Sequence, residues 1–443
     1  MFSNKDLRKL LIPLIIEQVL TSLMGTADTL MVSNLGSAAL SGVSLVDSIN
    51  KLLIFLFSAL ATGGTIVCSQ YLGRQDRANA SRSAQQVVLS AFSMSIIIAA
   101  LCLVCRRGLL RLIFGTVEAS VMAAAETYFF ITALTYPFIA LFSAEASLYR
   151  AAGNSRLPMI ISICSNCLNI VGNAVLIFVF RLGVAGAAIS TLASYIVSAS
   201  AILICQSRPG QVIQIGSLFR LRPDWKAMWT VLRVGIPTGV ENSMFQLGKL
   251  LVQSTVSTLG TTAIAANAMV ATLEGFTSMP SLAIGMGLMT IVGQCIGAGR
   301  LDEARTYIKK LTALSAVVLL CCNWLMYAAT GPLVRVAGME ADAARLTVHV
   351  MLIASIIKPV FWPMAFVPLS GMRGAGDVKF GMMVSVISMW LFRVVLTSLL
   401  CRVFNVGLIG IWCGYFVDWA IRSIAFTLRY RSGKWAKFCV IDG

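Results

Sequence analysis

The sequence predicts an all-α polytopic membrane protein with twelve transmembrane helices, arranged as two parallel six-helix repeats around a central cleft. Of its 443 residues, 58% are hydrophobic and only 12% are charged, whereas a soluble domain carries about 25% charged residues. Apolar runs of about 20 residues recur along the whole chain, and each is long enough to cross ~30 Å of hydrocarbon. These runs are continuous rather than alternating, so a transmembrane β-barrel is excluded.

The apolar runs define the order of the elements. The longest polar interval contains Pro, Gly and several basic residues, which favour a loop. We therefore predict an amino-terminal lobe at 1–206, a cytoplasmic linker at 207–227, a carboxy-terminal lobe at 228–430 and a cytoplasmic tail at 431–443. The twelve predicted spans lie at residues 10–33, 44–71, 84–105, 120–143, 158–180, 184–205, 228–257, 264–296, 307–330, 346–369, 381–401 and 406–428.

The basic residues indicate the orientation of the spans. With both termini in the cytoplasm, most Lys and Arg fall in cytoplasmic connections, as the positive-inside rule requires. The cluster Arg106, Arg107 and Arg111 is an exception. The same bias accounts for the net charge of +17 without a nucleic-acid partner. Because no cleavage site follows a short apolar segment, we expect the first span to be retained.

Short motifs of the first half recur in the second at a nearly constant offset. Each half has an even number of spans, so both halves run through the membrane in the same direction. Such parallel repeats, related by an axis along the membrane normal, occur in secondary transporters. The pairs are Pro13-x3-Glu17 with Pro237-x3-Glu241, Gln70-x2-Gly73 with Gln294-x2-Gly297, and Arg150-Ala-Ala-Gly153 with Arg373-Gly-Ala-Gly376.

These motifs also carry a family resemblance. With them, the sequence resembles the multidrug and toxic compound extrusion (MATE) family over essentially its whole length, and its amino-terminal lobe resembles the DinF type rather than the NorM type. The resemblance implies the MATE fold and cation-coupled efflux across the cytoplasmic membrane by alternating access, without ATP. The residues that carry it are Ala27-Asp28-Thr29, Gln70-x2-Gly73-Arg74, Arg150-Ala-Ala-Gly153-Asn154, Gly235-Ile-Pro237-x3-Glu241, Gly293-Gln294 and Arg373-Gly-Ala-Gly376-Asp377.

Asp28 is the first candidate functional residue. A charge within an apolar span costs roughly 3 kcal/mol on insertion scales. The repeat counterpart of Asp28 is Val252, so this carboxylate has no twin in the second half. Low dielectric favours the neutral form of a carboxyl group, and Asp28 is therefore a candidate to bind and release a proton. The alternative is a polar residue that only satisfies the helix packing.

Three amides on the fifth span are candidate partners of Asp28. Asn166, Asn169 and Asn173 follow one another at spacings of three and four, on one helix face. The MATE resemblance implies a cation-coupling pocket of Asp28, Asn169, Asn173 and Thr191. Asn173 stands where some relatives have a second Asp, which favours H⁺ over Na⁺ because hard cations prefer carboxylate oxygens. The alternative is that the amides join neighbouring helices.

Glu17, Glu241 and Lys249 form a candidate second polar site. Glu17 lies 11 residues before Asp28, about three helical turns, and Glu241 is its repeat mate. In the family, the glutamate of the seventh span belongs to a cation site with an Asp on the tenth. The matching stretch here is Lys358-Pro-Val-Phe361 and lacks that Asp, so we expect Glu241 to pair with Lys249 instead.

We therefore predict an antiporter, driven by H⁺ or by Na⁺, that exports cationic or neutral amphipathic organic compounds as a monomer. The alternatives are a flippase for a lipid-linked precursor from the same superfamily, a membrane-embedded enzyme, and a channel. No Gly-x4-Gly-Lys-Ser/Thr motif is present, which excludes ATP as the fuel. With His349 as the single histidine, the sequence offers no metal site and no nucleophile–base pair, and we expect no cofactor besides the coupling ion.

Overall fold

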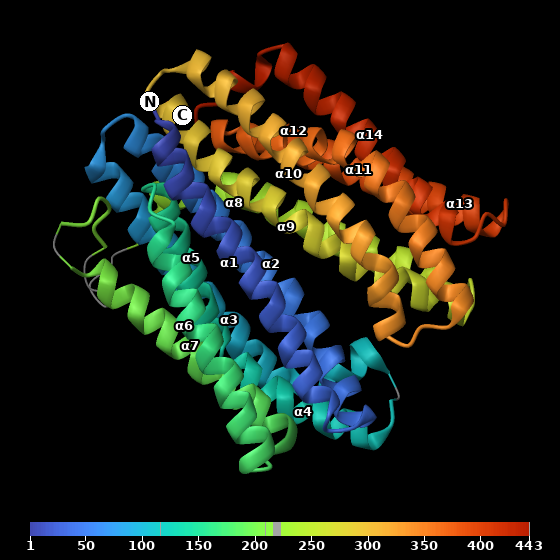
Figure 1. The fold of residues 1–443 in the computed structure, drawn as a ribbon. Helices are drawn as coiled ribbons and strands as arrows, with labels where there is room; N and C mark the ends of the chain where they lie inside the picture. Colours follow the sequence, from blue (N-terminus) through green and yellow to red (C-terminus); the bar gives the residue numbers. More distant parts are fainter. Residues whose placement is uncertain (116, 209, 216–222, 443) are drawn as a thin grey trace. The chain divides into compact units, whose positions relative to one another are not determined.

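A computed structural model of the chain describes residues 1–115, 117–208, 210–215 and 223–442 (Figure 1). Every regular element in these ranges is helical, which confirms the predicted fold class. The main helices are α1 (Asn4–Ser33), α2 (Ser37–Gly73), α3 (Arg77–Phe114), α4 (Ala119–Ala133), α5 (Tyr136–Ala151), α6 (Arg156–Asn173), α7 (Gly183–Gln206), α8 (Trp225–Ser257), α9 (Thr261–Gly297), α10 (Leu301–Val336), α11 (Ala341–Ala375), α12 (Val378–Ser388), α13 (Thr397–Arg402) and α14 (Leu408–Arg431). Two π-helical segments, η1 (Ala174–Val179) and η3 (Met389–Leu396), continue α6 and α12, and two short 3₁₀ turns, η4 (Lys434–Lys437) and η5 (Val440–Asp442), end the chain.

The helices account for the twelve predicted spans. Within the described residues, ten helical segments are long and apolar enough to cross a membrane, or eleven when α4 and α5 are counted as one bent span. Helix α8 has 33 residues and is also long enough, at a rise of 1.5 Å per residue, although it is more polar. We count α8 as the twelfth span.

The fourth predicted span, at 120–143, is broken into two helices near Pro137, a residue that could mark a bend. Helices α4 and α5 meet at an angle of 47°. Pro137 lies in the first turn of α5. Proline lacks a backbone N–H and cannot continue the hydrogen bonds of α4, whereas it is well tolerated in the first turn of a helix, so a new helix starts at Tyr136.

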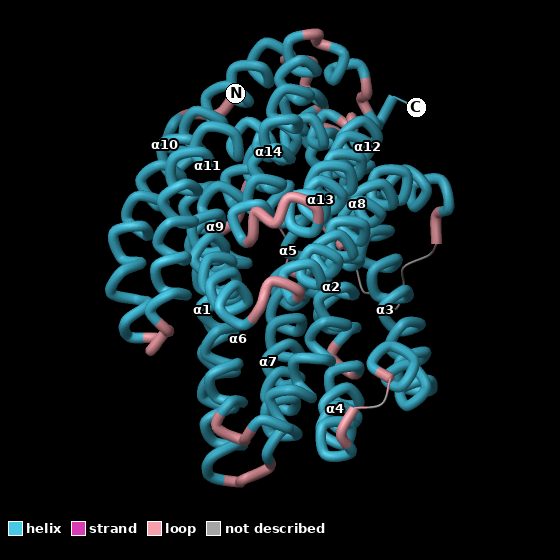
Figure 2. Tube along the Cα trace, turned by 90° about the vertical axis from the view of Figure 1, so that its right-hand side faces the viewer, coloured by secondary structure: helices cyan, strands magenta, loops and turns pink. Residues whose placement is uncertain are grey.

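The chain forms two compact units, Asn4–Gly239 and Val240–Gly443, the second joined by Met1–Ser3. In the first unit, α2 packs against α3, α4 and α5, and α1 packs against α6. In the second unit, α9, α10 and α11 pack against one another and α14 packs against α11 (Figures 1 and 2). The limits of the predicted lobes at 206 and 228 stay a prediction.

The repeat is visible in the backbone. Helices α2 and α9 each have 37 residues. Each begins directly after a glycine, Gly36 or Gly260, with φ of 98° or 90° and ψ of 169°. Side chains with a Cβ rarely adopt this conformation, so both turns require glycine. The two halves therefore use the same turn at equivalent positions of the repeat.

Asp76 marks the start of α3 in the connection after α2. Its carboxylate accepts hydrogen bonds from the Asn79 backbone N–H, at 3.0 Å, and from Asn79 Nδ2, at 2.6 Å. These hydrogen bonds favour the charged form and hold the pKa of Asp76 below its usual range. The cap satisfies a backbone donor that the first helical turn would otherwise leave without a partner.

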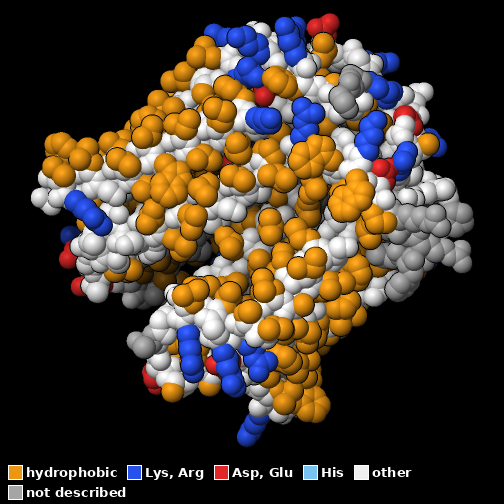
Figure 3. Space-filling model, turned by 180° about the vertical axis from the view of Figure 1, so that it is seen from behind, with side chains coloured by type: hydrophobic (Ala, Val, Ile, Leu, Met, Phe, Trp, Pro, Cys, Tyr) orange, Lys and Arg blue, Asp and Glu red, His pale blue; other side chains and the backbone are white. Residues whose placement is uncertain are grey.

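Hydrophobic side chains cover most of the face seen in Figure 3, whereas Lys and Arg gather toward its ends. Several large apolar side chains are almost fully exposed, including Val104 at 85%, Leu325 at 75% and Val336 at 87%. Exposed apolar surface on this scale is unusual for a soluble monomer. A lipid environment explains it, because hydrocarbon tails solvate these side chains.

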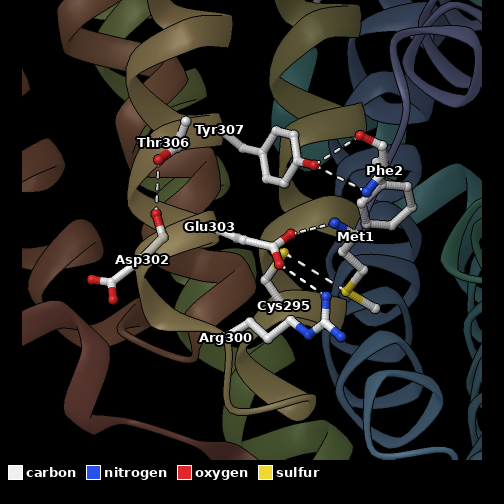
Figure 4. Close-up of polar contacts among 8 residues, drawn as sticks. All are labelled: Met1, Phe2, Cys295, Arg300, Asp302, Glu303, Thr306 and Tyr307. Atoms are coloured by element: carbon white, nitrogen blue, oxygen red, sulfur yellow. Dashed lines mark hydrogen bonds and ion pairs between the residues drawn. The ribbon is translucent and has the colours of Figure 1, made fainter.

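Both ends of the chain are anchored on the second unit. The backbone N–H of Phe2 donates to the Tyr307 hydroxyl, which in turn donates to the Phe2 carbonyl, both at 2.9 Å (Figure 4). The amino group of Met1 pairs with Glu303. At the other end, the Trp435 side chain is fully buried, and its Nε1 donates to the Tyr430 carbonyl at 3.2 Å.

Candidate functional site

Asp28 lies on α1, where hydrogen bonds connect it with α6. Asn173 Nδ2 donates to Asp28 Oδ1 at 2.6 Å and lies 3.3 Å from Asn169 Oδ1. Asn169 Nδ2 in turn lies 3.2 Å from Thr191 Oγ1 on α7. The structure thus brings together the four residues expected to couple a cation, and we call Asp28, Asn169, Asn173 and Thr191 the amino-terminal polar site.

The buried amides of this site can present either an N–H or a C=O group to Asp28. Asn169 and Asn173 are 0% and 1% exposed, while Asp28 and Thr191 are half-buried. Turning the Asn169 amide over lets its Nδ2 donate to Asp28 Oδ1 at 2.8 Å, while its Oδ1 accepts from Thr191. Among the described residues, Asn173 Oδ1 has no hydrogen-bond partner. The site therefore combines one carboxylate with amide groups that can present either N–H or C=O.

Close approach of α6 and α7 positions the amides. A Cβ atom at Gly172 would lie 2.4 Å from Ser190 Oγ, so any larger residue there would force the Ser190 side chain to move. The Ser190 hydroxyl donates to the Asn169 carbonyl at 2.8 Å. Directly after Asn173 the helix changes to the π-helical segment η1. Such segments occur often at functional sites because they interrupt the regular hydrogen bonding.

Asn166, the first amide of the predicted stripe, stands apart from these contacts. It is half-buried, and its Nδ2 has no hydrogen-bond partner among the described residues. The contacts to Asp28 come from the two amides further along α6. Helical spacing therefore placed three amides on one face, and the packing of α1 selected two of them.

Glu17 and Glu241 each pair with an arginine of their own unit. Arg150 Nη1 lies 3.6 Å from Glu17 Oε1, and Arg373 Nη2 donates to Glu241 Oε2 at 2.5 Å. The two pairs are repeat mates, because Glu17 recurs as Glu241 and Arg150 recurs as Arg373 in the aligned motifs. Each pair joins the middle of a long helix, α1 or α8, to the last turn of another helix, α5 or α11.

The expectation that Glu241 pairs with Lys249 is wrong, since Arg373 is its partner. Eight residues along a helix span about 12 Å, which is too far for this ion pair without a sharp kink. The Lys249 ammonium instead lies 4.8 Å from the centre of the Phe245 ring. Glu241 and Lys249 therefore do not form the ion pair expected of the second polar site, and Glu17 pairs with Arg150 within its own unit.

Sequence reasoning missed the partner of Lys358. Lys358 Nζ donates to the Glu274 carbonyl at 3.0 Å and to Thr277 Oγ1 at 2.6 Å. It also forms an ion pair with the Glu274 carboxylate. Lys358 is 0% exposed and Glu274 6%. The sequence did contain one indication of this pair, because Glu274 is the single acidic residue within the predicted eighth span.

A second buried charge cluster, also missed, surrounds Asp418 on α14. Arg393 Nη2 lies 2.9 Å from Asp418 Oδ2, and Arg422 Nε donates to Asp418 Oδ1 at 2.8 Å. Ser388 Oγ donates to the same Oδ1 at 2.6 Å. The spacing of Asp418 and Arg422 is i, i+4, which typically joins two side chains on one helix face. That spacing was a signal in the sequence.

None of the described residues form a group of three or more His, Cys, Asp or Glu side chains able to hold a metal ion. A cation at the amino-terminal polar site would therefore find one carboxylate, with amide and hydroxyl oxygens as the remaining ligands. This ligand set can hold a proton on Asp28 without change. It fits Na⁺ only after amide oxygens turn toward the ion.

A family model gives the decisive comparison. The MatE model matches the chain twice, over residues 13–175 and 237–399. The two matches start at Pro13 and Pro237, which are also equivalent positions of the repeated motifs. The chain belongs to the MATE family. This result confirms both the resemblance and the internal repeat.

Individual MATE proteins are similar along nearly the whole chain. The "Probable multidrug resistance protein NorM" of Thermotoga maritima is 27% identical over 450 residues, covering 99% of this chain and 94% of that protein. The "Uncharacterized transporter YisQ" of Bacillus subtilis is 27% identical over 428 residues, covering 96% and 93%.

Solved structures show the same fold. A crystal structure of MATE in the straight conformation has a TM-score of 0.89 at 19% identity, covering 97% of this chain and 95% of that one. A mutant of the Vibrio cholerae MATE transporter VcmN has a TM-score of 0.88 at 20% identity, covering 99% and 98%.

As a member of the MATE family, this chain is a multi-pass membrane transporter for the efflux of small molecules, and not an enzyme. The alternative of a membrane-embedded enzyme is thereby excluded. The assignment of its amino-terminal lobe to the DinF type stays a prediction, as do the roles of the individual site residues.

Proposed function

We propose that this MATE protein is a cation-coupled antiporter that exports amphipathic organic compounds across the cytoplasmic membrane by alternating access. The coupling ion is H⁺, with Na⁺ as the alternative ion, and the protein works as a monomer without ATP. One observation carries the proposal. Asp28 is a membrane carboxylate hydrogen-bonded to buried amides, and it has no counterpart in the second half.

Protonation of Asp28 would change the forces on α1. A charged Asp28 is held toward α6 by the short hydrogen bond from Asn173, and hydrogen bonds to charged groups are stronger than neutral ones. A neutral Asp28 weakens that bond and lowers the cost of placing the side chain in an apolar environment. Helix α1 can then repack, and the ion drives transport because it binds one conformation better than the other.

The hydrogen-bond donors at the site support H⁺ as the coupling ion. Asn173 Nδ2 donates to Asp28, and Asn169 does so as well when its amide is turned over. N–H groups stabilise a carboxylate but repel a metal cation. Na⁺ would need oxygen ligands, and therefore the opposite orientation of both amides.

The test is transport by Asp28→Asn in proteoliposomes with an imposed pH gradient or Na⁺ gradient. We expect the variant to lose gradient-driven export of ethidium and pyrenebutyrate, because Asn cannot exchange a proton. Asp302→Asn, whose side chain is 99% exposed on α10, serves as the control and should transport normally. Coupled export that persists in Asp28→Asn would refute the proposal, and the gradient that drives the wild type identifies the ion. Movement of a labelled lipid in place of the dyes would favour the flippase alternative.

A further inference from the structure

The repeat gives the amino-terminal polar site an equivalent place in the second unit. When Pro13 is aligned with Pro237, Asn169 corresponds to Arg393 and Thr191 corresponds to Tyr415. The carboxylate is replaced by Val252. The equivalent place therefore carries a cation where the first half has an amide, and an apolar side chain where the first half has an acid.

Positive charge exceeds negative charge in this cluster. Arg393 and Arg422 are 3% and 1% exposed, and they share the carboxylate of Asp418, which is 0% exposed. Two guanidinium groups against one carboxylate leave one positive charge inside a membrane-spanning bundle. Arg393 Nε has no hydrogen-bond partner among the described residues. A buried charge of this kind is costly unless a counter-charge is supplied.

Aromatic rings connect the buried arginines with the surface of the unit. The Arg393 guanidinium lies 4.1 Å from the centre of the Tyr415 ring and 5.2 Å from that of Phe245. Lys249 lies 4.8 Å from the same Phe245 ring. Lys249 is exposed, whereas Phe245 and Tyr415 are half-buried. The cluster thus extends from buried guanidinium groups to an ammonium at the surface.

A π-helical segment of the backbone lies at this cluster, as one does beside the amino-terminal polar site. Arg393 lies within the π-helical segment η3, and η1 directly follows Asn173 of the amino-terminal polar site. Both halves therefore interrupt the regular helix next to their polar cluster. A purely structural ion pair does not require such an interruption, and π-helical segments occur often at functional sites.

We propose that Lys249, Phe245, Tyr415, Arg393 and Arg422 form a carboxy-terminal cationic site that binds the anionic group of an amphipathic organic anion. Lys249 contacts the carboxylate, the buried arginines add positive potential at low dielectric, and the two aromatic rings contact the apolar body. The inference rests on the proposed efflux function and narrows its substrate class. It differs from the sequence-based expectation of a cationic or neutral compound.

Equilibrium binding tests the site. The full-length protein in nanodiscs of zwitterionic lipid is titrated with pyrenebutyrate, with its neutral amide and with a pyrenyl trimethylammonium, and energy transfer from tryptophan to pyrene reports binding. We expect pyrenebutyrate to bind on the order of tenfold more tightly than the amide, as hydrogen bonds to a charged group imply. Equal affinities, or tighter binding of the ammonium compound, would overturn the inference.

A matched pair of exposed lysines locates the site. Lys249→Gln should weaken pyrenebutyrate binding on the order of tenfold and leave the amide unaffected. Lys379→Gln removes the same charge from an exposed position on α12 of the same unit, and it should change neither probe. If both variants behave alike, the binding comes from general surface charge and the site is refuted.

Two buried variants distinguish binding from a structural role. Arg393→Gln removes positive charge and should weaken pyrenebutyrate binding, whereas Asp418→Asn removes the counter-charge and should strengthen it. A structural role alone would lower the stability of both variants and affect all probes equally, contrary to the inference. Because Lys249→Gln lies at the surface, it remains informative if the buried variants fail to fold.

The anion could also come from a lipid headgroup. Adding phosphatidylglycerol to the nanodiscs separates the two sources. Pyrenebutyrate affinity that is unchanged supports a transported organic anion, and displacement by the lipid would overturn that assignment. The titrations use no ion gradient, so a failure here leaves the Asp28 proposal intact, and a failure of Asp28→Asn leaves this site intact.

Discussion

Single charged residues in the membrane helices fall into two groups according to the repeat. The pairs Glu17–Arg150 and Glu241–Arg373 occur in both halves, and each joins two helices of its own unit. Asp28 occurs in one half only. We expect the two repeated pairs to serve the shared fold, and Asp28 to serve a task that the halves do not share.

The buried pair of Lys358 and Glu274 yields a stability prediction. Lys358→Met leaves the Glu274 carboxylate buried without its partner, and Glu274 Oε1 already lacks a hydrogen bond among the described residues. Breaking a buried pair in this way costs about 3–5 kcal/mol. We expect a clear drop in the thermal unfolding midpoint of the protein in detergent.

The double variant Lys358→Met with Glu274→Gln is the matching control, because it removes both charges. It should recover most of the lost stability. Arg305→Met breaks an exposed pair with Asp302 and should cost at most about 1 kcal/mol. If the double variant is as unstable as Lys358→Met alone, the loss of stability comes from lost packing rather than from an unpaired buried charge.

At the scale of elements, close helix packing depends on small residues. A Cβ atom at Gly374 of α11 would lie 2.4 Å from the Met289 carbonyl oxygen of α9. Small residues let membrane helices approach closely, since dispersion contacts rather than water drive their association. Gly374 belongs to the Arg373-Gly-Ala-Gly376 motif, so this motif has a packing role as well as a charge.

Gly374→Ala should therefore destabilise the protein. Forcing a methyl group into this contact costs about 1–3 kcal/mol, measured as a lower unfolding midpoint in detergent. Gly108→Ala tests the opposite case, because nothing lies within 4 Å of a Cβ at that helical position. It should be neutral or stabilising by up to about 1 kcal/mol. Similar losses in both variants would contradict the packing argument.

The broken fourth span shows that the sequence predicts an apolar segment but not whether that segment forms one helix or two. Hydropathy placed one span at 120–143, and the apolar composition is indeed continuous there. Pro137 was a recognisable sign of a bend. Whether a proline kinks a helix or divides it depends on the helices packed around it, and here the structure has α4 and α5 at 47°.

At the scale of the whole molecule, the twelve-span topology predicts the side on which each loop lies. With both termini in the cytoplasm, Glu118 before α4 faces outward and Asp302 at the start of α10 faces inward. Cysteines introduced at these exposed positions, with the exposed native cysteines replaced, can be labelled with a membrane-impermeant maleimide. In right-side-out vesicles, Glu118→Cys should react, and Asp302→Cys should react only after permeabilisation.

The same experiment tests α8 as a span. If α8 did not cross the membrane, Asp302→Cys would lie on the same side as Glu118→Cys and would react in intact vesicles. Lys437→Cys reports the carboxy terminus and should behave as Asp302→Cys does. Labelling of all three positions from outside would contradict the orientation derived from the basic residues.

The sequence by itself determined the fold class, the repeat and the family. These properties depend on local sequence patterns, namely apolar runs, helical spacing and motifs that recur at a nearly constant offset. It also led to the members of the amino-terminal polar site, although the family resemblance contributed Thr191 and the choice among the amides.

Only the tertiary structure decided which charges meet. Glu241 contacts Arg373 rather than Lys249, Lys358 contacts Glu274, and Arg393 contacts Asp418. In each of these contacts the partner lies on another helix. Helix rotation and crossing, which packing sets and local spacing does not, determine which side chains come within reach. Those crossings also bring Asp28 against the amides of α6 in the first unit, and two arginines against Asp418 in the second.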